Sequence, residues 1–401
     1  MAEVIVRKAE LKALEGDRAV TEAMRQINPD VVAAYPVTPQ TEIVMEFSQF
    51  VAEGLVDTEF IPVESEFAAM SSCIGASSAG ARAMSATCGP GLELMWENLW
   101  VASGLRCPIV MAVVNRSHAA PLNILTDQTD MMGSRDTGWV QIYAENHQEV
   151  YDNFIQAVRI AEHPDVLLPI MSGHAGFVLG HTLGRVEVLP DEVVRNFVGE
   201  YKPLYSLLDI DHPKTFGAYD HWDYFFEHRR QVFEAINNAL RVIPEIGQEY
   251  GRISGRYYGL VEPYRLDDAD AVIMIIGSGA GACREAVDEM REKGTKAGML
   301  KVRCFRPFPA EEVVKALKDK KAVAVMDRCA CFGAEGSPLF TETCAAFFNR
   351  GLRMKLINYF YGLGGRDTVP SEFCDILREL SQIAETGEIK PPLVRYLAVR
   401  E

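Results

Sequence analysis

Short apolar runs of strand length, separated by segments with helical periodicity, recur through most of this chain. This alternation is typical of parallel α/β units, in which each strand is buried on both faces. The first half of the chain contains such runs at residues 31–37, 59–63, 81–87, 107–115 and 166–173. The second half contains them at residues 271–279, 296–305, 321–328 and 355–362. The pattern therefore predicts two α/β blocks.

The segments between the first runs predict helices at residues 41–54, 65–80, 91–105 and 146–164. The last of these has clear ends, because Asn146 followed by Glu149 fits a capping box and Pro164 supplies a stop. From about 185 to 262 the periodicity weakens, apart from one amphipathic stretch at 221–243. We therefore expect a first domain over residues 1–184, a connecting region over 185–262 and a second α/β domain over 263–401.

Length and charge narrow the class of protein. A chain of 401 residues is longer than a domain with a single hydrophobic core ordinarily is, so two domains are expected. The net charge of -16 argues against a nucleic-acid or anionic-membrane partner. No run approaches the roughly 18 apolar residues of a membrane-spanning helix, and residues 1–17 lack the apolar stretch of a signal peptide. We expect a cytoplasmic protein.

The nine cysteines show neither disulfide-framework nor iron–sulfur spacing. The eight histidines likewise lack zinc-ligand spacing, so no metal site is expected on this chain. We interpret the cysteines as ordinary buried thiols.

Unusual residues follow four successive strands of the first block, at the edge where ligands gather in open α/β sheets. Pro36 and Thr38 follow the first strand, and Glu64 and Glu66 follow the second. Thr87 ends the third strand, and Gly89 and Gly91 beyond it let another group approach the backbone closely. Asn115 and Arg116 begin the irregular segment after the fourth strand. Their joint placement predicts a shared pocket.

Each of these residues also has a purely structural interpretation. Thr38 could cap the helix that starts near Gln40. Arg116 could be solvated, or it could pair with Asp127 or Asp130. Either glutamate could favour the positive end of the following helix, and the glycines could be routine loop residues.

Five longer stretches are distinctive: "AAYPVTPQTEI", "PVESEFAAMSSCIGASSAGAR", "IVMAVVNRSHAAPLNILTDQTD", "RDTGWVQIYAENHQEVYD" and "INYFYGLGGRD". They closely resemble the α subunit of four-subunit 2-oxoacid:ferredoxin oxidoreductases, with the pyruvate and 2-oxoisovalerate members nearest. The resemblance covers nearly the whole chain. It implies a thiamine-diphosphate pyrimidine-side α/β domain followed by an α/β domain like the transketolase C-terminal domain.

The resemblance also implies the reaction and the partners. The expected activity is oxidative decarboxylation of a 2-oxo acid, pyruvate above all, with coenzyme A, yielding acyl-CoA, CO2 and reduced ferredoxin. Thiamine diphosphate would be shared with a partner chain, and Mg²⁺ and the iron–sulfur clusters would lie on partner chains. These partners are the β, γ and δ subunits, in an expected dimer of the hetero-oligomer. The chain's own lack of a Gly-Asp-Gly triplet with a distant Asn agrees with that division.

Within this resemblance, Glu66 matches the glutamate that hydrogen-bonds the aminopyrimidine ring and activates the cofactor. A carboxylate at the edge of a dry pocket suits this role. Thr38 and Arg116 match positions that bind the substrate carboxylate, for which a planar guanidinium is well shaped. The resemblance also places Pro36, Thr87, Gly89 and Gly91 near the cofactor. Glu64 is interpreted as support for the turn.

One difference from pyruvate-type relatives concerns the loop near the cofactor. They commonly carry Ser-Gln-Gly where this chain has Cys88-Gly89-Pro90-Gly91, and Gly-Pro-Gly is more like the 2-oxoglutarate type. A branched-chain or aryl 2-oxo acid, or 2-oxoglutarate, therefore stays open as the substrate.

Two hypotheses from other classes also stay open. Gly277, Gly279 and Ala282 follow a strand with the loose spacing of a dinucleotide-binding turn. The acidic residue expected at the end of the next strand is replaced by Lys301 and Arg303, so an NADP- or flavin-binding subunit is one alternative. A tight turn that packs a helix on a sheet explains the glycines equally. A non-catalytic scaffold subunit with a degenerate pocket is the other alternative.

Overall fold

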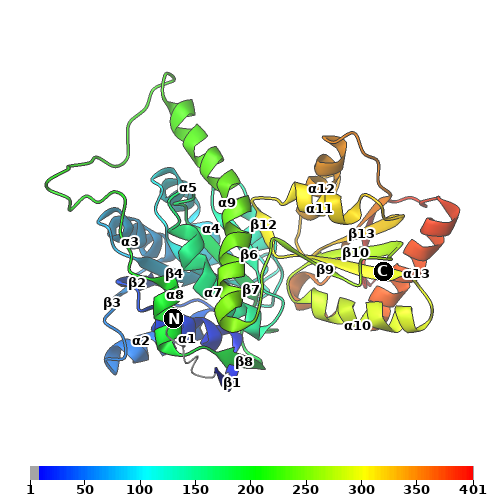
Figure 1. Cartoon of the computed structure of the whole chain (residues 1–401), viewed down its shortest axis with the longest axis horizontal. Helices are drawn as coiled ribbons and strands as arrows, with labels where there is room; N and C mark the ends of the chain where they lie inside the picture. The colour runs from blue at the N-terminus through cyan, green and yellow to red at the C-terminus, as the bar shows by residue number, and fades with distance from the viewer. Residues whose placement is uncertain (1–8, 401) are drawn as a thin grey trace, which may run out of the picture.

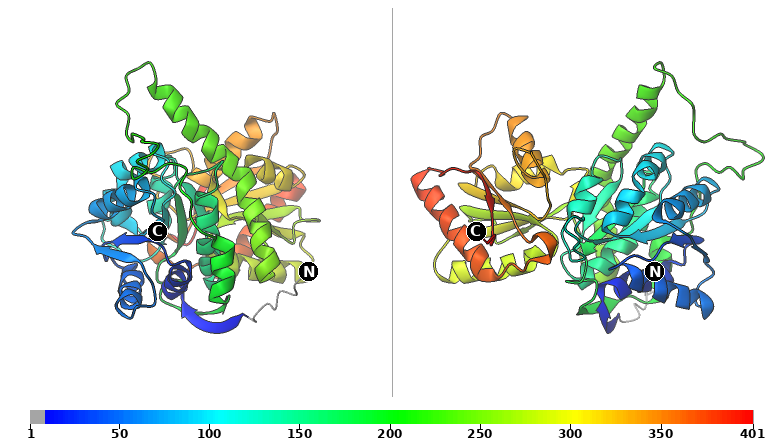
Figure 2. Two further views of the ribbon diagram at one scale, coloured as in Figure 1. Left: turned by 60° about the vertical axis from the view of Figure 1, so that its left-hand side comes forward. Right: turned by 180° about the vertical axis from the view of Figure 1, so that it is seen from behind.

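Two α/β domains lie side by side in the structure, a computed structural model that describes residues 9–400 (Figure 1). The first eight residues of the expected first domain lie outside the described residues. The N-terminal part of the chain belongs to one domain and the C-terminal part to the other, as the opposite view also shows (Figure 2).

The first sheet has seven strands in the order β12-β6-β7-β5-β4-β2-β3. They are β2 (Val31–Ala34), β3 (Glu59–Pro62), β4 (Ala83–Thr87), β5 (Val110–Asn115), β6 (Val140–Tyr143), β7 (Ile170–Ala175) and β12 (Cys304–Arg306). All neighbours pair in parallel except β12, which is antiparallel to β6. Strands overlap each of the five predicted runs of the first block, and β6 is an addition.

The second sheet has six strands in the order β15-β14-β13-β10-β11-β9. They are β9 (Val261–Tyr264), β10 (Ala271–Ile276), β11 (Ala297–Val302), β13 (Ala322–Asp327), β14 (Leu356–Phe360) and β15 (Val394–Tyr396). The prediction of one strand over 296–305 is wrong, because the chain leaves this sheet after β11 and joins the first sheet as β12. Arg303 marks the crossing, and its buried guanidinium donates to Asn153 and Gln156 of the first domain.

Helices cover both faces of each sheet. Those of the first domain are α1 (Gly16–Ile27), α2 (Thr41–Ala52), α3 (Glu66–Ser78), α4 (Gly89–Leu94), α5 (Trp96–Gly104), α6 (Thr129–Gly133) and α7 (His147–Ala161). Those after it are α8 (Asp191–Val198), α9 (Phe225–Ser254), α10 (Gly279–Glu292), α11 (Ala310–Leu317), α12 (Pro338–Phe348) and α13 (Pro370–Thr386). A short ribbon of β1 (Glu10–Glu15) and β8 (Leu183–Val188) completes the first domain.

Alternate residues of the buried strands enter different cores, as the two-residue period of a strand requires. Val110, Ala112 and Val114 of β5 pack with α1, α7 and α9, whereas Met111 and Val113 pack on the opposite face. That second core continues into the second domain, where it includes residues of β10, β11 and α11. The two domains are therefore joined by shared apolar packing.

The helix ends agree only partly with the capping signals. Asn146 caps α7 as predicted, since its side chain accepts from the Glu149 amide. The return half of the expected box is absent, because the Glu149 carboxylate accepts from the Glu145 amide instead. The helix predicted over 91–105 is interrupted at Met95, which separates α4 from α5.

The connecting region contains more regular structure than its weak periodicity indicated. The predicted amphipathic stretch lies at the start of α9, a helix of 30 residues, and α8 precedes it. Both helices bury residues in the core of the first domain. The expected boundary between residues 184 and 185 falls inside β8. Before α9 the chain extends away from the body as a long loop (Figure 1).

Two further properties concern the whole described chain. None of the helices within residues 9–400 combines the length and apolarity needed to cross a membrane. All nine cysteines are free thiols. Seven are buried, in agreement with their interpretation, whereas Cys331 and Cys344 are half-buried.

Candidate active site

The loops that follow β2, β4 and β5 meet at the carboxyl edge of the first sheet. Arg116 Nη1 lies 2.9 Å from the carbonyl oxygen of Thr38 and donates a hydrogen bond to it. The Cys88 thiol also donates to this oxygen, at 3.1 Å. The structure thus brings three of the predicted strand ends into direct contact.

Glu66 begins α3 at this edge. Ser65 caps the helix by accepting from the Ala68 amide, which places Glu66 in the first turn, where a carboxylate is favoured by the helix dipole. The residue is only 6% exposed. Among residues 9–400 no hydrogen-bond donor or cation reaches its carboxylate. A buried carboxylate left without a partner is costly, so it is suited to a partner supplied from outside the chain.

Gly91 lies directly against Glu66. A Cβ at Gly91 would lie 2.6 Å from Glu66 Oε1 and 2.6 Å from Thr87 Oγ1, so only glycine fits. The Thr87 hydroxyl is buried and has no hydrogen-bond partner in the described chain. Glu66, Thr87 and Gly91 therefore form one cluster, in which the carboxylate and the hydroxyl have no hydrogen-bond partner within the described chain.

Gly89 serves Arg116 in the same way. It has a φ of 35°, and a Cβ there would lie 3.2 Å from the Cβ and the carbonyl oxygen of Arg116. The interpretation of both glycines as routine loop residues is therefore wrong. The first turn of α4 carries one glycine against each of the two predicted charged residues.

Arg116 is 9% exposed, so its interpretation as a solvated residue is wrong. Its guanidinium donates to the carbonyl oxygens of Thr38 and Asn123, and no carboxylate within residues 9–400 pairs with it. The alternative of an ion pair with Asp127 or Asp130 is therefore also wrong. A buried cation that holds only neutral acceptors can still bind an anion.

Asp130 fixes the loops on which this arrangement depends. Its carboxylate accepts from the amides of Gly89, Arg116 and Met131 and from the side chain of Asn115, at 2.8 to 3.0 Å. It is fully buried, and burial raises its pKa to about 6. Sequence reasoning considered Asp130 only as an ion-pair partner, because nothing in the sequence indicates that it binds backbone amides.

The remaining predicted residues lie at the margin of this arrangement. Thr38 and Pro36 are exposed, and Pro36 makes no hydrogen bond with the other site residues in the described chain. Thr38 does not cap α2, because Gln40 precedes that helix and its side chain binds Val37 and Ala86 instead. Glu64 is exposed and accepts no hydrogen bond within residues 9–400. Burial thus distinguishes Glu66 from Glu64.

The turn over Gly277–Ala282 packs against neighbouring protein groups. A Cβ at Gly277 would meet the Gln128 amide at 2.7 Å, and one at Gly279 would collide with the Tyr361 hydroxyl. Arg303, which the NADP alternative required for a 2′-phosphate, is 2% exposed and bonded internally. The turn is therefore explained by packing, and the basis for an NADP site is lost.

Lys301, the other basic residue of that alternative, joins the two domains. Its ammonium lies 2.5 to 2.7 Å from carboxylate oxygens of Glu145, Glu149 and Glu262. Burial alone would lower the pKa of Lys301, but these carboxylates raise it above its usual value. The three carboxylates could otherwise suggest a metal site, yet the ammonium occupies the space between them.

Comparison with known families identifies both domains. The family model described as "Pyruvate flavodoxin/ferredoxin oxidoreductase, thiamine diP-bdg" matches residues 22–248. The chain belongs to the pyruvate:ferredoxin oxidoreductase family. A second model, "Pyruvate:ferredoxin oxidoreductase core domain II", matches residues 269–373. This family membership confirms the resemblance expected from the sequence.

Three proteins similar to this chain are named as enzyme subunits, PorA or VorA. The chain is 50% identical to the pyruvate synthase subunit PorA of Thermotoga maritima, over 98% of this chain and 100% of that protein. It is 45% identical to PorA of Methanocaldococcus jannaschii, over 95% of this chain and 97% of that protein. It is 44% identical to the ketoisovalerate oxidoreductase subunit VorA of Pyrococcus abyssi, over 94% of this chain and 95% of that protein.

Solved structures confirm the expected fold class. A 2-oxoglutarate:ferredoxin oxidoreductase from Magnetococcus marinus matches with a TM-score of 0.75 at 19% identity, over 93% of this chain and 66% of that chain. A split-gene transketolase matches with a TM-score of 0.54 at 11% identity, over 93% of this chain and 100% of that chain. The chain therefore has a thiamine-diphosphate pyrimidine-type domain followed by a transketolase C-terminal-like domain.

Proposed function

We propose that this chain is the α subunit of a 2-oxoacid:ferredoxin oxidoreductase that converts pyruvate and coenzyme A to acetyl-CoA, CO2 and reduced ferredoxin. The near full-length similarity to PorA proteins supports pyruvate as the substrate. The similarity to VorA keeps 2-oxoisovalerate as a second candidate. The observation that carries the proposal is the Glu66 carboxylate, in a residue only 6% exposed and without a hydrogen-bond partner in residues 9–400. It lies beside the buried Thr87 hydroxyl, which also lacks a partner there.

The residues at the carboxyl edge fit thiamine diphosphate. Glu66 offers an acceptor from a dry position, Thr87 offers an unused hydroxyl, and Gly91 keeps the space between them free of a side chain. When bound, the cofactor supplies the nucleophilic carbon for attack on the 2-oxo group. Glu66 would hold a proton between its carboxylate and the pyrimidine ring.

Arg116 and Thr38 would bind the substrate carboxylate. The guanidinium already orients itself on the Thr38 carbonyl oxygen and has no carboxylate partner in residues 9–400. An incoming carboxylate would supply the missing negative charge in a site shielded from water. The exposed Thr38 side chain is free to join it. Pro36 and Gly89 would shape the loops on either side.

The proposal assigns the rest of the active centre to other chains. The β, γ and δ subunits would supply the diphosphate and Mg²⁺ site and the iron–sulfur clusters, and the cytoplasm would be the working compartment. Residues 1–184 with the connecting region 185–262 would form the pyrimidine side, and residues 263–401 the second domain. This division explains why the chain carries a carboxylate for the ring but no diphosphate motif.

The test compares Glu66→Gln with Glu64→Gln in the assembled complex. Glutamine preserves the shape of the side chain but cannot share a proton, so turnover with pyruvate should fall at least about 100-fold in Glu66→Gln. The exposed Glu64→Gln should retain wild-type turnover. Normal turnover in Glu66→Gln would contradict the proposal. Rates on pyruvate, 2-oxoisovalerate and 2-oxoglutarate in wild type then decide the substrate.

A further inference from the structure

An exposed apolar arm projects from the first domain, far from the candidate active site. We define the arm as residues 200–233, which comprise the long loop before α9 and the first turns of that helix (Figure 1). Seven aromatic residues of the arm are 53% to 92% exposed: Tyr205, Tyr219, Trp222, Tyr224, Phe225, Phe226 and Phe233. At about 150–250 Å² each, their exposed surface is on the order of 700–1,200 Å². That range includes the roughly 800 Å² per partner of a standard protein interface.

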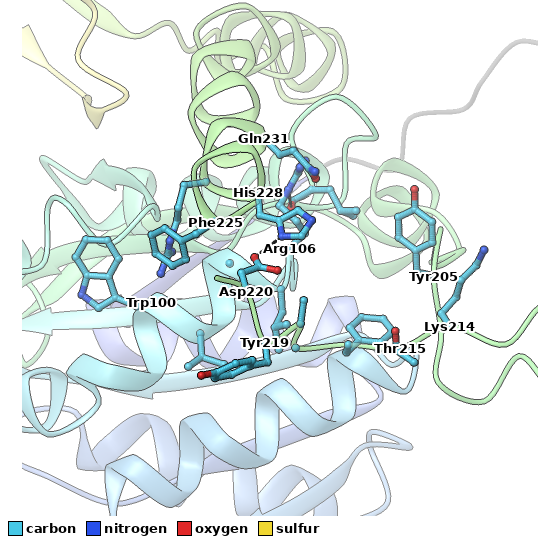
Figure 3. Close-up of a pocket in the computed structure, with 18 of the residues that line it drawn as sticks. Trp100, Arg106, Tyr205, Lys214, Thr215, Tyr219, Asp220, Phe225, His228 and Gln231 are labelled. Carbon is cyan, nitrogen blue, oxygen red and sulfur yellow. Dashed lines mark hydrogen bonds and ion pairs between the residues drawn. The ribbon is translucent and has the colours of Figure 1, made fainter. Parts of the chain in front are cut away.

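A hollow of about 850 Å³ lies at the base of the same arm, between α5 and the start of α9. Trp100 and Phe225 line one side of it, and Tyr205 and Lys214 line the other (Figure 3). The arm therefore carries a projecting aromatic edge and an aromatic hollow within one patch. A patch with both features can pair with a second copy of itself about a two-fold axis.

Charged residues of the patch lie both on its projecting edge and in its hollow. Asp223 and Glu227 follow Trp222 and Phe226 in sequence, and neither acid has an ion-pair partner within residues 9–400. At the hollow, Lys214 and Arg229 also lack a carboxylate partner in the described chain. The Arg229 guanidinium instead lies 5.6 Å from the centre of the Trp100 ring. The projecting edge thus carries two unpaired carboxylates. The hollow, which also contains Glu97 and the Asp220–His228 pair, carries the two cations Lys214 and Arg229 without a carboxylate partner in the described chain.

From this complementarity we propose that the arm forms a two-fold interface between two copies of this chain. Trp222 and Phe226 of each copy enter the hollow of the other, where Asp223 and Glu227 meet Lys214 and Arg229. The arm carries six acidic and four basic residues, so the net charge of -16 of the whole chain is not concentrated at this contact. Apolar burial would supply the affinity, and the charges would fix the register.

This interface leaves the candidate active site free for the diphosphate-binding chain. The arm is attached at the end of α3, where the Leu207 amide donates to the carbonyl oxygen of Ser78 at 2.9 Å. Glu66 lies at the other end of this helix, which is about 20 Å long for its 13 residues. The proposed contact is therefore independent of the catalytic proposal, and either can fail without the other.

A charge-swap experiment on the full chain tests the interface. One variant, Asp223→Lys with Glu227→Lys, reverses the edge, and the other, Lys214→Glu with Arg229→Glu, reverses the hollow. Each variant alone should place like charges together, so its dimer dissociation constant in sedimentation velocity should rise at least about tenfold. An equal mixture should restore wild-type-like dimers. In a mixed dimer the basic edge of the first variant meets the acidic hollow of the second, and the acidic edge of the second meets the basic hollow of the first.

Matched controls separate the interface from a folding defect or another partner. Trp222→Ser should weaken the dimer, whereas Phe348→Ser, at a residue 82% exposed outside the arm, should not. Wild-type thermal melting of each charge variant checks the fold. A monomeric wild-type chain, or a mixture that fails to pair, would overturn the proposal. Loss of binding to another subunit with self-association unchanged would also overturn it.

Discussion

Gly91 is in van der Waals contact with the carboxylate of Glu66, so closely that a single methyl group at Gly91 would lie 2.6 Å from Glu66 Oε1. This contact couples the first turn of α4 to the first turn of α3. No hydrogen bond from within residues 9–400 reaches the carboxylate, which leaves its oxygens free for an external donor.

The first prediction concerns that contact. Gly91→Ala should destabilise the chain by about 1–3 kcal/mol through overpacking and should also reduce turnover, because Glu66 must move. Gly281→Ala is the matched control, since a Cβ there meets nothing within 4 Å and α10 should gain about 0.5–1 kcal/mol. Thermal melting and steady-state rates of both variants give the comparison. Equal behaviour of the two would show that the contact is unimportant.

The second prediction concerns substrate binding by Arg116. Arg116→Lys keeps the charge but loses the planar fork, so the KM for pyruvate should rise about 10- to 100-fold. The KM for coenzyme A should stay unchanged. Arg185→Lys, at a side chain 73% exposed, is the control and should leave both constants as in wild type. An unchanged KM for pyruvate in Arg116→Lys would exclude Arg116 from the substrate site.

The third prediction follows from the raised pKa of Asp130, about 6 against an ordinary 3.8. The folded chain binds this proton more tightly than the unfolded chain does. Its contribution to stability is therefore complete below pH 3.8 and is lost as the pH rises through 6. Asp130→Asn, which removes the titration, should be more destabilising at pH 4.5 than at pH 6.5 in melting experiments. A destabilisation that grows with pH would contradict this sign.

The fourth prediction concerns the junction between the domains. Lys301→Met should cost about 3–5 kcal/mol of stability, because the buried Glu149 loses its one ion-pair partner in the described chain, whereas Glu145 and Glu262 keep only Arg284. Lys12→Met removes a partly buried pair with Glu22, whose carboxylate keeps its pair with Arg25, and should cost less than about 1 kcal/mol. Urea unfolding of the two variants measures the difference. Similar costs would mean that solvent screens the Lys301 cluster as well.

Much of the fold could be predicted because buried parallel strands leave a clear local pattern. The run around Val110–Asn115 is apolar at every position before Asn115, and it forms a central strand. The short β12 could not be predicted as a strand of the first sheet, because Cys304 pairs with Ile142 of β6, which lies 162 residues earlier in sequence and belongs to the other domain. Nor does local periodicity show that α8 and α9 pack into the first core.

The candidate site also has features that the sequence predicts and features that only the tertiary structure shows. The strand-end positions of Glu66 and Arg116 can be read from the sequence, and the resemblance singles them out. Their surroundings depend on tertiary contacts: Asp130 lies in a helix beyond an irregular loop, yet its carboxylate binds the amides of Gly89 and Arg116. Likewise, only the folded chain shows that Glu66 is buried and Glu64 exposed.

The most direct test measures hydrogen–deuterium exchange at the thiazolium C2 position of thiamine diphosphate bound to the assembled complex. The proposed role of Glu66 predicts fast exchange in wild type and in Glu64→Gln, and exchange slowed at least about 100-fold in Glu66→Gln. Cofactor content determined in the same samples shows that the site is filled. Equally fast exchange in Glu66→Gln with the cofactor bound would contradict the assignment of this carboxylate as the activating acid.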